Sequence, residues 1–149
     1  MSRKALHDAM RDIEADTQTN SYILVIADID HFKLVNDNFG HQHGDVCLIA
    51  FSEILQSECE PNTVFRYGGD EFCLLFCNAE MEQVVAACWR MLRKVEALRF
   101  EAKPESTLTA SFGIAAFHLP MNAAQLFVQA DQALYQAKEA RNTVCVYEP

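Results

Sequence analysis

The chain contains stretches in which apolar side chains recur at helical spacing and shorter stretches that are continuously apolar or alternate. Helical spacing over residues 3–15, 81–95 and 122–137 predicts amphipathic helices that pack on a sheet. Residues 22–27, YILVIA, form an apolar run rich in β-branched side chains, which favours a central strand covered on both faces. We therefore expect a layered domain of helices and strands.

Two further helices are predicted directly after this strand. Asp30 is expected to cap a short helix, because its carboxylate can accept from the first free N–H groups, and Gly40 is expected to end it. A second helix with an apolar stripe from Cys47 to Leu55 follows.

Four more stretches predict the rest of the sheet. TVFRY at residues 63–67 and EFCLLF at 71–76 flank Gly68 to Asp70, which is the pattern of a hairpin. Residues 107–117 alternate between apolar and small or polar side chains, and TVCVY at 143–147 predicts a last strand. The order α-β-α-α-β-β-α-β-α-β predicts one α/β domain over the whole chain. Its mixed sheet of about five strands is expected to have the hairpin in its middle and helices on its flanks.

The charge balance limits the partners that the chain can bind. Twenty-one acidic residues against twelve basic ones give a formal net charge of −9, so the chain lacks the basic footprint of a nucleic-acid-binding protein. An anionic ligand would need a metal ion or a few local cations to bring it in. No apolar run approaches the roughly 20 residues of a membrane-spanning helix, and a signal peptide is not evident, so we expect a cytoplasmic domain without membrane contact.

Cysteines and histidines give weaker signals. None of the six cysteines belongs to a CxxC pair, and most lie in apolar stretches, so they are interpreted as reduced core residues. His31, His41 and His43 suggest a metal site, but a polar loop is the favoured interpretation.

Two carboxylates lie where predicted strands end. Asp28 follows the first buried strand and Asp70 lies in the hairpin turn, so neighbouring strands would bring them together to bind a hard cation such as Mg²⁺. If the strand begins at the turn, alternation along it predicts that Asp70 and Glu71 point to different sides. An equally favoured alternative is that Asp70 only forms the turn and Glu71 is a solvated edge residue.

Other polar residues suggest nucleotide binding. The start of the helix after Asp30, together with Lys33, can bind phosphate. Combined with two metal-binding carboxylates, these groups are the ones that phosphoryl transfer requires. Asn36 and Asp45 have the amide and carboxylate that suit a guanine edge, although helix caps or solvated residues are the stronger interpretation from sequence. Lys138 and Arg141 could reach phosphates or, more simply, complement the C-terminal end of the last helix.

Four blocks of the chain together carry a family resemblance. They read DIDHFKLVNDNFGHQHGD at residues 28–45, RYGGDEF at 66–72, SFGIA at 111–115 and ADQALYQAK at 130–138. In this order and spacing the chain resembles the GGDEF family, the diguanylate cyclases named after the motif that here is Gly68-Gly69-Asp70-Glu71-Phe72. The resemblance covers nearly the whole chain.

The resemblance implies a nucleotidyl cyclase fold related to polymerase palm domains. It implies an Mg²⁺-dependent enzyme that condenses two GTP molecules into cyclic di-GMP with release of pyrophosphate. Because each domain of the family holds one GTP, it also implies that two copies meet as a two-fold homodimer for catalysis.

The resemblance also assigns roles by position. Asp28, the Ile29 carbonyl and Asp70 would bind two Mg²⁺ ions, or Mn²⁺. Asn36 and Asp45 would bind guanine. The terminal phosphates would be bound by Lys33 and the backbone of His31 and Phe32, assisted by Lys138 and Arg141. Glu71 would bind metal or assist removal of the proton from the attacking 3′-hydroxyl. Gly68 and Gly69 would let the turn run close to the nucleotide.

The chain departs from the family pattern in three places. The family's inhibitory product site has Arg-x-x-Asp where residues 59–62 read Cys-Glu-Pro-Asn, so we expect no product inhibition there. The segment from Lys138 to Arg141 is one residue shorter than the family's Lys-x-x-Gly-Arg and lacks its glycine. The family's leading Leu-Thr-Gly-Leu block is missing before SRKAL at residues 2–6, so we expect a domain cut from a longer protein with an upstream sensory region, through which that protein could be membrane-anchored.

Two alternatives remain open at the level of sequence. A degenerate family member would hold GTP or a partner protein without turnover, and the altered Lys138 to Arg141 spacing favours it. A generic ferredoxin-like interaction domain would leave Asp28, Asn36 and Asp70 as coincidences.

Overall fold

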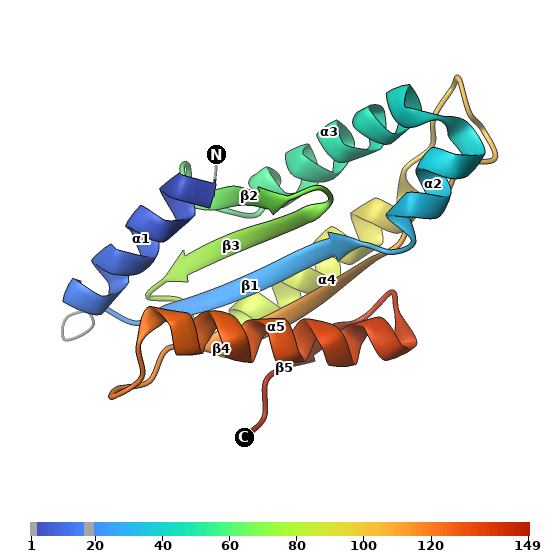
Figure 1. Ribbon diagram of the computed structural model, residues 1–149. Helices are drawn as coiled ribbons and strands as arrows, with labels where there is room; N and C mark the ends of the chain where they lie inside the picture. The colour runs from blue at the N-terminus through green and yellow to red at the C-terminus, as the bar shows by residue number, and fades with distance from the viewer. Residues whose placement is uncertain (1–2, 17–19) are drawn as a thin grey trace.

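The computed structural model describes residues 3–16 and 20–149 and shows a five-stranded sheet flanked by helices (Figure 1). In chain order the elements are α1 (Arg3–Asp16), β1 (Tyr22–Ile29), α2 (Phe32–Phe39), α3 (His41–Ser57), β2 (Val64–Gly68), β3 (Glu71–Cys77), α4 (Met81–Ala97), β4 (Ala110–Ala116), α5 (Ala123–Ala140) and β5 (Val144–Val146). The predicted order of helices and strands is confirmed. Ser2, the first residue of the SRKAL stretch, lies outside the described residues.

The strand order across the sheet is β2-β3-β1-β4-β5. Only β4 and β5 run parallel; the other three pairs are antiparallel. The mixed sheet is therefore confirmed, but the hairpin of β2 and β3 lies at one side of the sheet, not in its middle. The most apolar strand, β1, takes the centre, because that is where both faces of a strand are covered.

Alternate side chains of β1 enter two separate cores. One core lies beneath α3 and α4, and the other lies beneath α1 and α5 and includes Leu24 and Ile26. In Figure 1, α5 crosses in front of the sheet and α4 crosses behind it. The same view places the C-terminal ends of β1 and α5 and the turn between β2 and β3 at one end of the sheet. Distant parts of the sequence therefore meet there.

Gly113 sets how closely α5 packs on the sheet. A Cβ atom at this position would overlap the backbone nitrogen of Leu134 and the carbonyl oxygen of Ala130. The SFGIA block thus has a packing reason for its glycine. At the N-terminal end of α5, the Asn122 side chain accepts a hydrogen bond from the Gln125 N–H at 2.8 Å and caps the helix.

His41 and His43 lie in the first turn of α3, so the polar-loop interpretation is wrong. His43 is only 6% exposed, its Nε2 lies 2.7 Å from Ser106 Oγ, and its ring packs edge-on against Phe100. The apolar face of α3 begins one turn earlier than the apolar pattern suggested, because a histidine with one satisfied nitrogen can pack between aromatic rings.

The six cysteines are unpaired, and three of them are buried. Cys47, Cys73 and Cys88 are buried and Cys59 and Cys145 are partly buried, whereas Cys77 is exposed at the end of β3, against the core interpretation. Burial raises the pKa of the Cys59 thiol to about 12, which keeps it in the unreactive thiol form.

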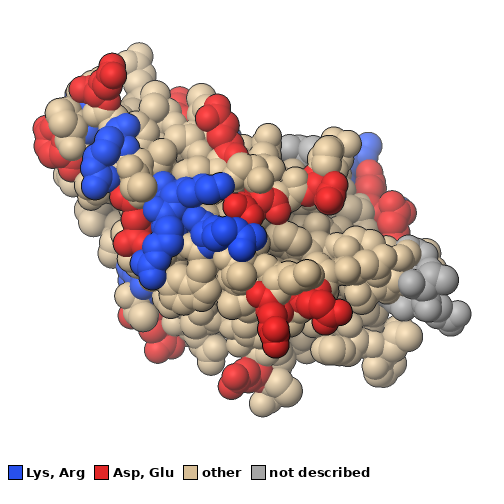
Figure 2. All heavy atoms as spheres, turned by 180° about the vertical axis from the view of Figure 1, so that it is seen from behind, with Lys and Arg blue, Asp and Glu red and all other residues tan. Residues whose placement is uncertain are grey.

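Lys and Arg side chains gather on the face seen from behind in Figure 2, with acidic side chains among them. Arg90 and Lys94 of α4 both pair with Glu58, at 2.9 and 3.1 Å. The basic charge on α4 is thus partly neutralised within the domain.

Among the described residues, no helix combines the length and the apolar character needed to cross a bilayer.

Candidate active site

Three carboxylates meet at the C-terminal end of β1. Asp28 lies directly opposite Glu71 in the antiparallel pairing of β1 and β3, so the two side chains leave the same face of the sheet. Asp70, in the turn before β3, shares a side-chain hydrogen bond with Asp28. The strand β3 begins at Glu71, so strand alternation does not apply to Asp70.

The environment of Asp28 disfavours its ionised form. Burial is the main cause that raises the pKa of Asp28, to about 8; the hydrogen bond to Asp70 and the charges of Asp70 and Glu71 raise it further, while Lys138 opposes them. Among the described residues, Asp28 Oδ1 is one of few buried side-chain oxygens without a hydrogen-bond partner. The pKa of Glu71 is also raised, by burial first and then by the charges of Asp131 and Asp70. A cation bound beside these carboxylates would compensate their negative charge.

The donor set at this edge fits a hard divalent cation. The carbonyl oxygen of Ile29 faces the same space, since Lys138 Nζ lies 3.4 Å from it. Two carboxylates and a carbonyl are ligands that Mg²⁺ prefers, and Mg²⁺ usually completes its shell with water and substrate phosphates. Although Asp28, Asp70 and Glu71 are neighbours, no group of three His, Cys, Asp or Glu side chains in the part of the chain that the structure describes is arranged to hold a metal ion by itself.

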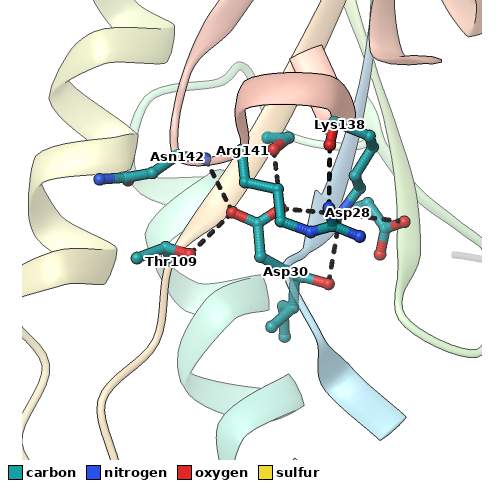
Figure 3. Close-up of polar contacts among 8 residues, drawn as sticks. Asp28, Asp30, Thr109, Lys138, Arg141 and Asn142 are labelled. Carbon is teal, nitrogen blue, oxygen red and sulfur yellow. Dashed lines mark hydrogen bonds and ion pairs between the residues drawn. The ribbon is translucent and has the colours of Figure 1, made fainter. Parts of the chain in front are cut away.

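Asp30 does not cap α2, against the prediction. Its side chain is fully buried and accepts four hydrogen bonds, from Thr109 Oγ1, Ser111 Oγ, Lys138 Nζ and the Asn142 N–H, at 2.7, 2.7, 2.9 and 2.8 Å (Figure 3). Burial opposes ionisation of Asp30, but these hydrogen bonds outweigh it and lower the pKa of this carboxyl.

Sequence reasoning missed this cluster, although a signal was present. Asp28 and Asp30 are two residues apart, as are Thr109 and Ser111, and the Asp30 N–H continues the ladder by donating to the Thr109 carbonyl at 2.9 Å. Period-two spacing of polar side chains on adjacent strands indicates one polar face.

Because Asp30 is engaged elsewhere, α2 begins without a side-chain cap. His31 precedes the helix in a left-handed conformation, with φ of 54°. The first N–H groups of a helix have no intrahelical acceptor and carry the positive end of its dipole, so they can bind an anion. Lys33 is exposed beside them.

Asn36 and Asp45 come together at the junction of α2 and α3. A Cβ atom at Gly44 would overlap Asn36 Oδ1, so the amide lies against the backbone next to Asp45. Asn36 Oδ1 is buried without a hydrogen-bond partner in the described residues, and Asp45 is exposed. The structure thus leaves one amide and one carboxylate available at this junction, and it adds Gly44 as the residue that makes room for the amide.

The two motif glycines border open space. Neither Gly68 nor Gly69 has a positive φ, and a Cβ atom at Gly69 would meet no described atom within 4 Å. The fold itself therefore does not require glycine at 69.

Arg141 completes the end of α5. Its backbone has φ of 61°, its N–H donates to the Ala137 carbonyl at 2.7 Å, and its guanidinium donates to the Lys138 carbonyl at 3.0 Å. Both contacts complement the C-terminal end of the helix.

Comparisons with known proteins agree with this geometry. A sequence model of the family described as "Diguanylate cyclase, GGDEF domain" matches residues 2–143. The chain is 37% identical over 119 residues to the probable diguanylate cyclase DgcC of Escherichia coli K12, which covers 78% of this chain and 32% of that protein. It is 36% identical over 127 residues to the diguanylate cyclase VdcA of Vibrio cholerae, with 81% and 38% covered. The chain thus spans about a third of the length of these relatives.

Solved structures show the same fold. The GGDEF domain of DgcB from Caulobacter crescentus, solved in complex with c-di-GMP, superposes with a TM-score of 0.91 at 29% identity, over 99% of this chain and 89% of that one. The active GGEEF domain of a diguanylate cyclase from Vibrio cholerae superposes with a TM-score of 0.84 at 28% identity, over 99% and 97%. The chain belongs to the GGDEF domain family of diguanylate cyclases, and its α+β palm-like fold is that of the family.

Proposed function

We propose that this domain catalyses condensation of two GTP molecules into cyclic di-GMP, with release of two pyrophosphates, when two copies face each other. The observation that carries the proposal is Asp28, whose buried, unpartnered oxygen lies beside Asp70 and Glu71 at the edge where a metal ion would compensate their charge. The names of relatives that match most of this chain support the same activity.

Each part of one GTP has a candidate partner. The Asn36 amide and the Asp45 carboxylate would bind the guanine edge, whose N1–H and N2–H₂ donors suit a carboxylate. The open N-terminus of α2, at His31 and Phe32, would hold the terminal phosphates together with Lys33. The open space at Gly69 would admit the nucleotide close to the turn.

Asp28, the Ile29 carbonyl and Asp70 would hold two Mg²⁺ ions. When bound, Mg²⁺ offsets the negative charge that builds up on the phosphate oxygens. Lys138 lies 3.5 Å from Asp28 Oδ2 and would supply a further positive charge at the same edge.

Glu71 is the candidate acceptor for the proton of the attacking 3′-hydroxyl. Its burial and its acidic neighbours raise its pKa, which makes its carboxylate a better base than an exposed glutamate. The hydroxyl oxygen then attacks the α-phosphorus of the GTP held by the other copy, and pyrophosphate leaves. The same exchange in the opposite direction closes the ring, so a single copy with one GTP would form no product.

Binding without turnover is the second candidate function. It is favoured by Arg141, whose guanidinium donates to the Lys138 carbonyl at the end of its own helix. We also propose that cyclic di-GMP does not inhibit the domain through residues 59–62, since Cys59 and Asn62 lack the charges that would clasp its phosphates.

Incubation of the concentrated protein with GTP and Mg²⁺, followed by chromatography, tests the proposal. We expect a peak of cyclic di-GMP that is lost in Asp70→Asn and that an exposed control, Asp37→Asn, retains. GTP binding without any product would favour the binding function, and the absence of GTP binding would contradict both.

A further inference from the structure

The Asp30 carboxylate has all its hydrogen-bonding positions filled by groups that lie in or directly beside two elements, β4 and α5. Oδ2 accepts from Thr109 and from the Asn142 N–H, and Oδ1 accepts from Ser111 and from Lys138. Thr109 lies just before β4, whereas Lys138 and Asn142 lie at and just beyond the last turn of α5. This one side chain therefore ties the C-terminal end of α5 to the edge of the sheet that carries Asp28 (Figure 3).

Lys138 depends on this tie for its place. Its ammonium lies 2.9 Å from Asp30 Oδ1, but 3.5 Å from Asp28 Oδ2 and 3.4 Å from the Ile29 carbonyl. The contact with Asp30 is thus the short one, and its acceptor is fully buried whereas the Asp28 side chain is 19% exposed. A charge-assisted hydrogen bond to a buried partner fixes a flexible lysine far better than one at the solvent.

An amide could not replace the carboxylate at this position. Each oxygen of Asp30 faces two donors, and the NH₂ group of an asparagine would face either Lys138 or the Asn142 N–H, neither of which can accept. The Ser111 or Thr109 hydroxyl could rotate and accept from the NH₂ group, but the second donor at the same position would still face it without an acceptor. Substitution by Asn would therefore release Lys138 or separate the end of α5 from the sheet.

We propose that Asp30 is a positioning residue, which holds the Lys138 ammonium beside Asp28 and the Ile29 carbonyl so that it contributes to binding the phosphates of the substrate. The inference rests on the proposed binding of GTP. It assigns to Asp30 no contact with the nucleotide or the metal, only with Lys138 and the residues that orient it.

A double-mutant cycle on ligand binding tests this role. Binding of a non-hydrolysable GTP analogue with Mg²⁺ is measured by calorimetry for the wild type, Asp30→Asn, Lys138→Ala and the double variant. If Asp30 acts through Lys138, each single substitution weakens binding about tenfold, and the double variant is also weakened about tenfold. A loss of about a hundredfold in the double variant, or unchanged binding in Asp30→Asn, would overturn the proposal.

A matched control separates positioning from folding. Ser106→Ala removes a different buried hydrogen bond, to His43, and is expected to lower the melting temperature while changing the affinity less than about twofold. If Asp30→Asn does not fold, Ser111→Ala replaces it, because it removes one donor from the oxygen that holds Lys138. It should weaken binding about threefold in the wild type and not in the Lys138→Ala background; equal losses in both backgrounds would refute the role. A wild-type protein that does not bind the analogue would instead refute the proposed function.

Discussion

Removing the charge of Asp28 should stabilise the protein while it abolishes metal binding. Asp28 keeps its proton in the folded state up to a pKa of about 8, whereas the unfolded chain releases it near 3.8. Folding therefore takes up a proton, and the contribution of Asp28 to stability is lost as the pH rises from 3.8 towards 8. Asp28→Asn is neutral in both states and lacks this loss.

The size of the effect follows from the same pKa values. A pH of 7 lies about 3 units above the pKa of 3.8 that Asp28 has in the unfolded chain, and each unit corresponds to about 1.36 kcal/mol. The upper bound on the destabilisation that Asp28 causes at pH 7 is therefore about 4 kcal/mol. Because the Asp28 side chain is 19% exposed, solvent screens its charge, and the expected gain in stability of Asp28→Asn falls to about 1–3 kcal/mol. This corresponds to a rise in melting temperature of about 2–10 °C.

Thermal unfolding in the absence of divalent metal measures the effect at pH 4 and pH 7.5. We expect Asp28→Asn to match the wild type at pH 4 and to exceed it at pH 7.5, while the exposed control Asp37→Asn differs by less than about 0.5 kcal/mol at both. Addition of Mg²⁺ should stabilise the wild type and not Asp28→Asn. A variant less stable than the wild type at pH 7.5, or an advantage of equal size at pH 4, would refute the reasoning.

Three further predictions test other parts of the structure. Gly113→Ala should destabilise the fold by about 3 kcal/mol in denaturant unfolding, because its Cβ meets helix backbone, whereas Gly69→Ala should leave stability within about 0.5 kcal/mol and weaken GTP binding; equal stability losses would contradict this. Combined Cys59→Arg and Asn62→Asp should confer inhibition by cyclic di-GMP that the wild type does not show, and inhibition of the wild type would disprove the expected absence of a product site. Burial, aided by the charge of Lys103, lowers the pKa of His43, so stability should fall as the pH drops below 6.5, and this fall should shrink in His43→Gln; an identical acid profile would argue against it.

Most of the fold could be predicted from hydrophobic periodicity, because β1 and the helices bury strongly patterned faces. The place of the hairpin could not be predicted this way, since periodicity defines which residues are buried but not which strands are neighbours. The helical start of α3 was missed for a related reason, as His43 looks polar in sequence and is satisfied by Ser106, a partner far along the chain.

For the site, the sequence indicated the types of residue but not all of their contacts. Asp28 and Asp70 could be brought together by assuming that their strands pair, and the structure shows that Asp28 lies opposite Glu71. The role of Asp30 could not be predicted from its local context, which is that of a helix cap, because its four donors come from residues at least 79 positions away. Tertiary contacts of this kind override local preference.

The most direct test of the proposed reaction is the initial rate of cyclic di-GMP formation, measured with saturating GTP and Mg²⁺ over a range of protein concentrations. We expect product, with a rate that rises more steeply than the first power of concentration where light scattering shows monomers, because two copies must meet. No product at any concentration while GTP binds, or a rate strictly proportional to the concentration of monomers, would contradict the proposal.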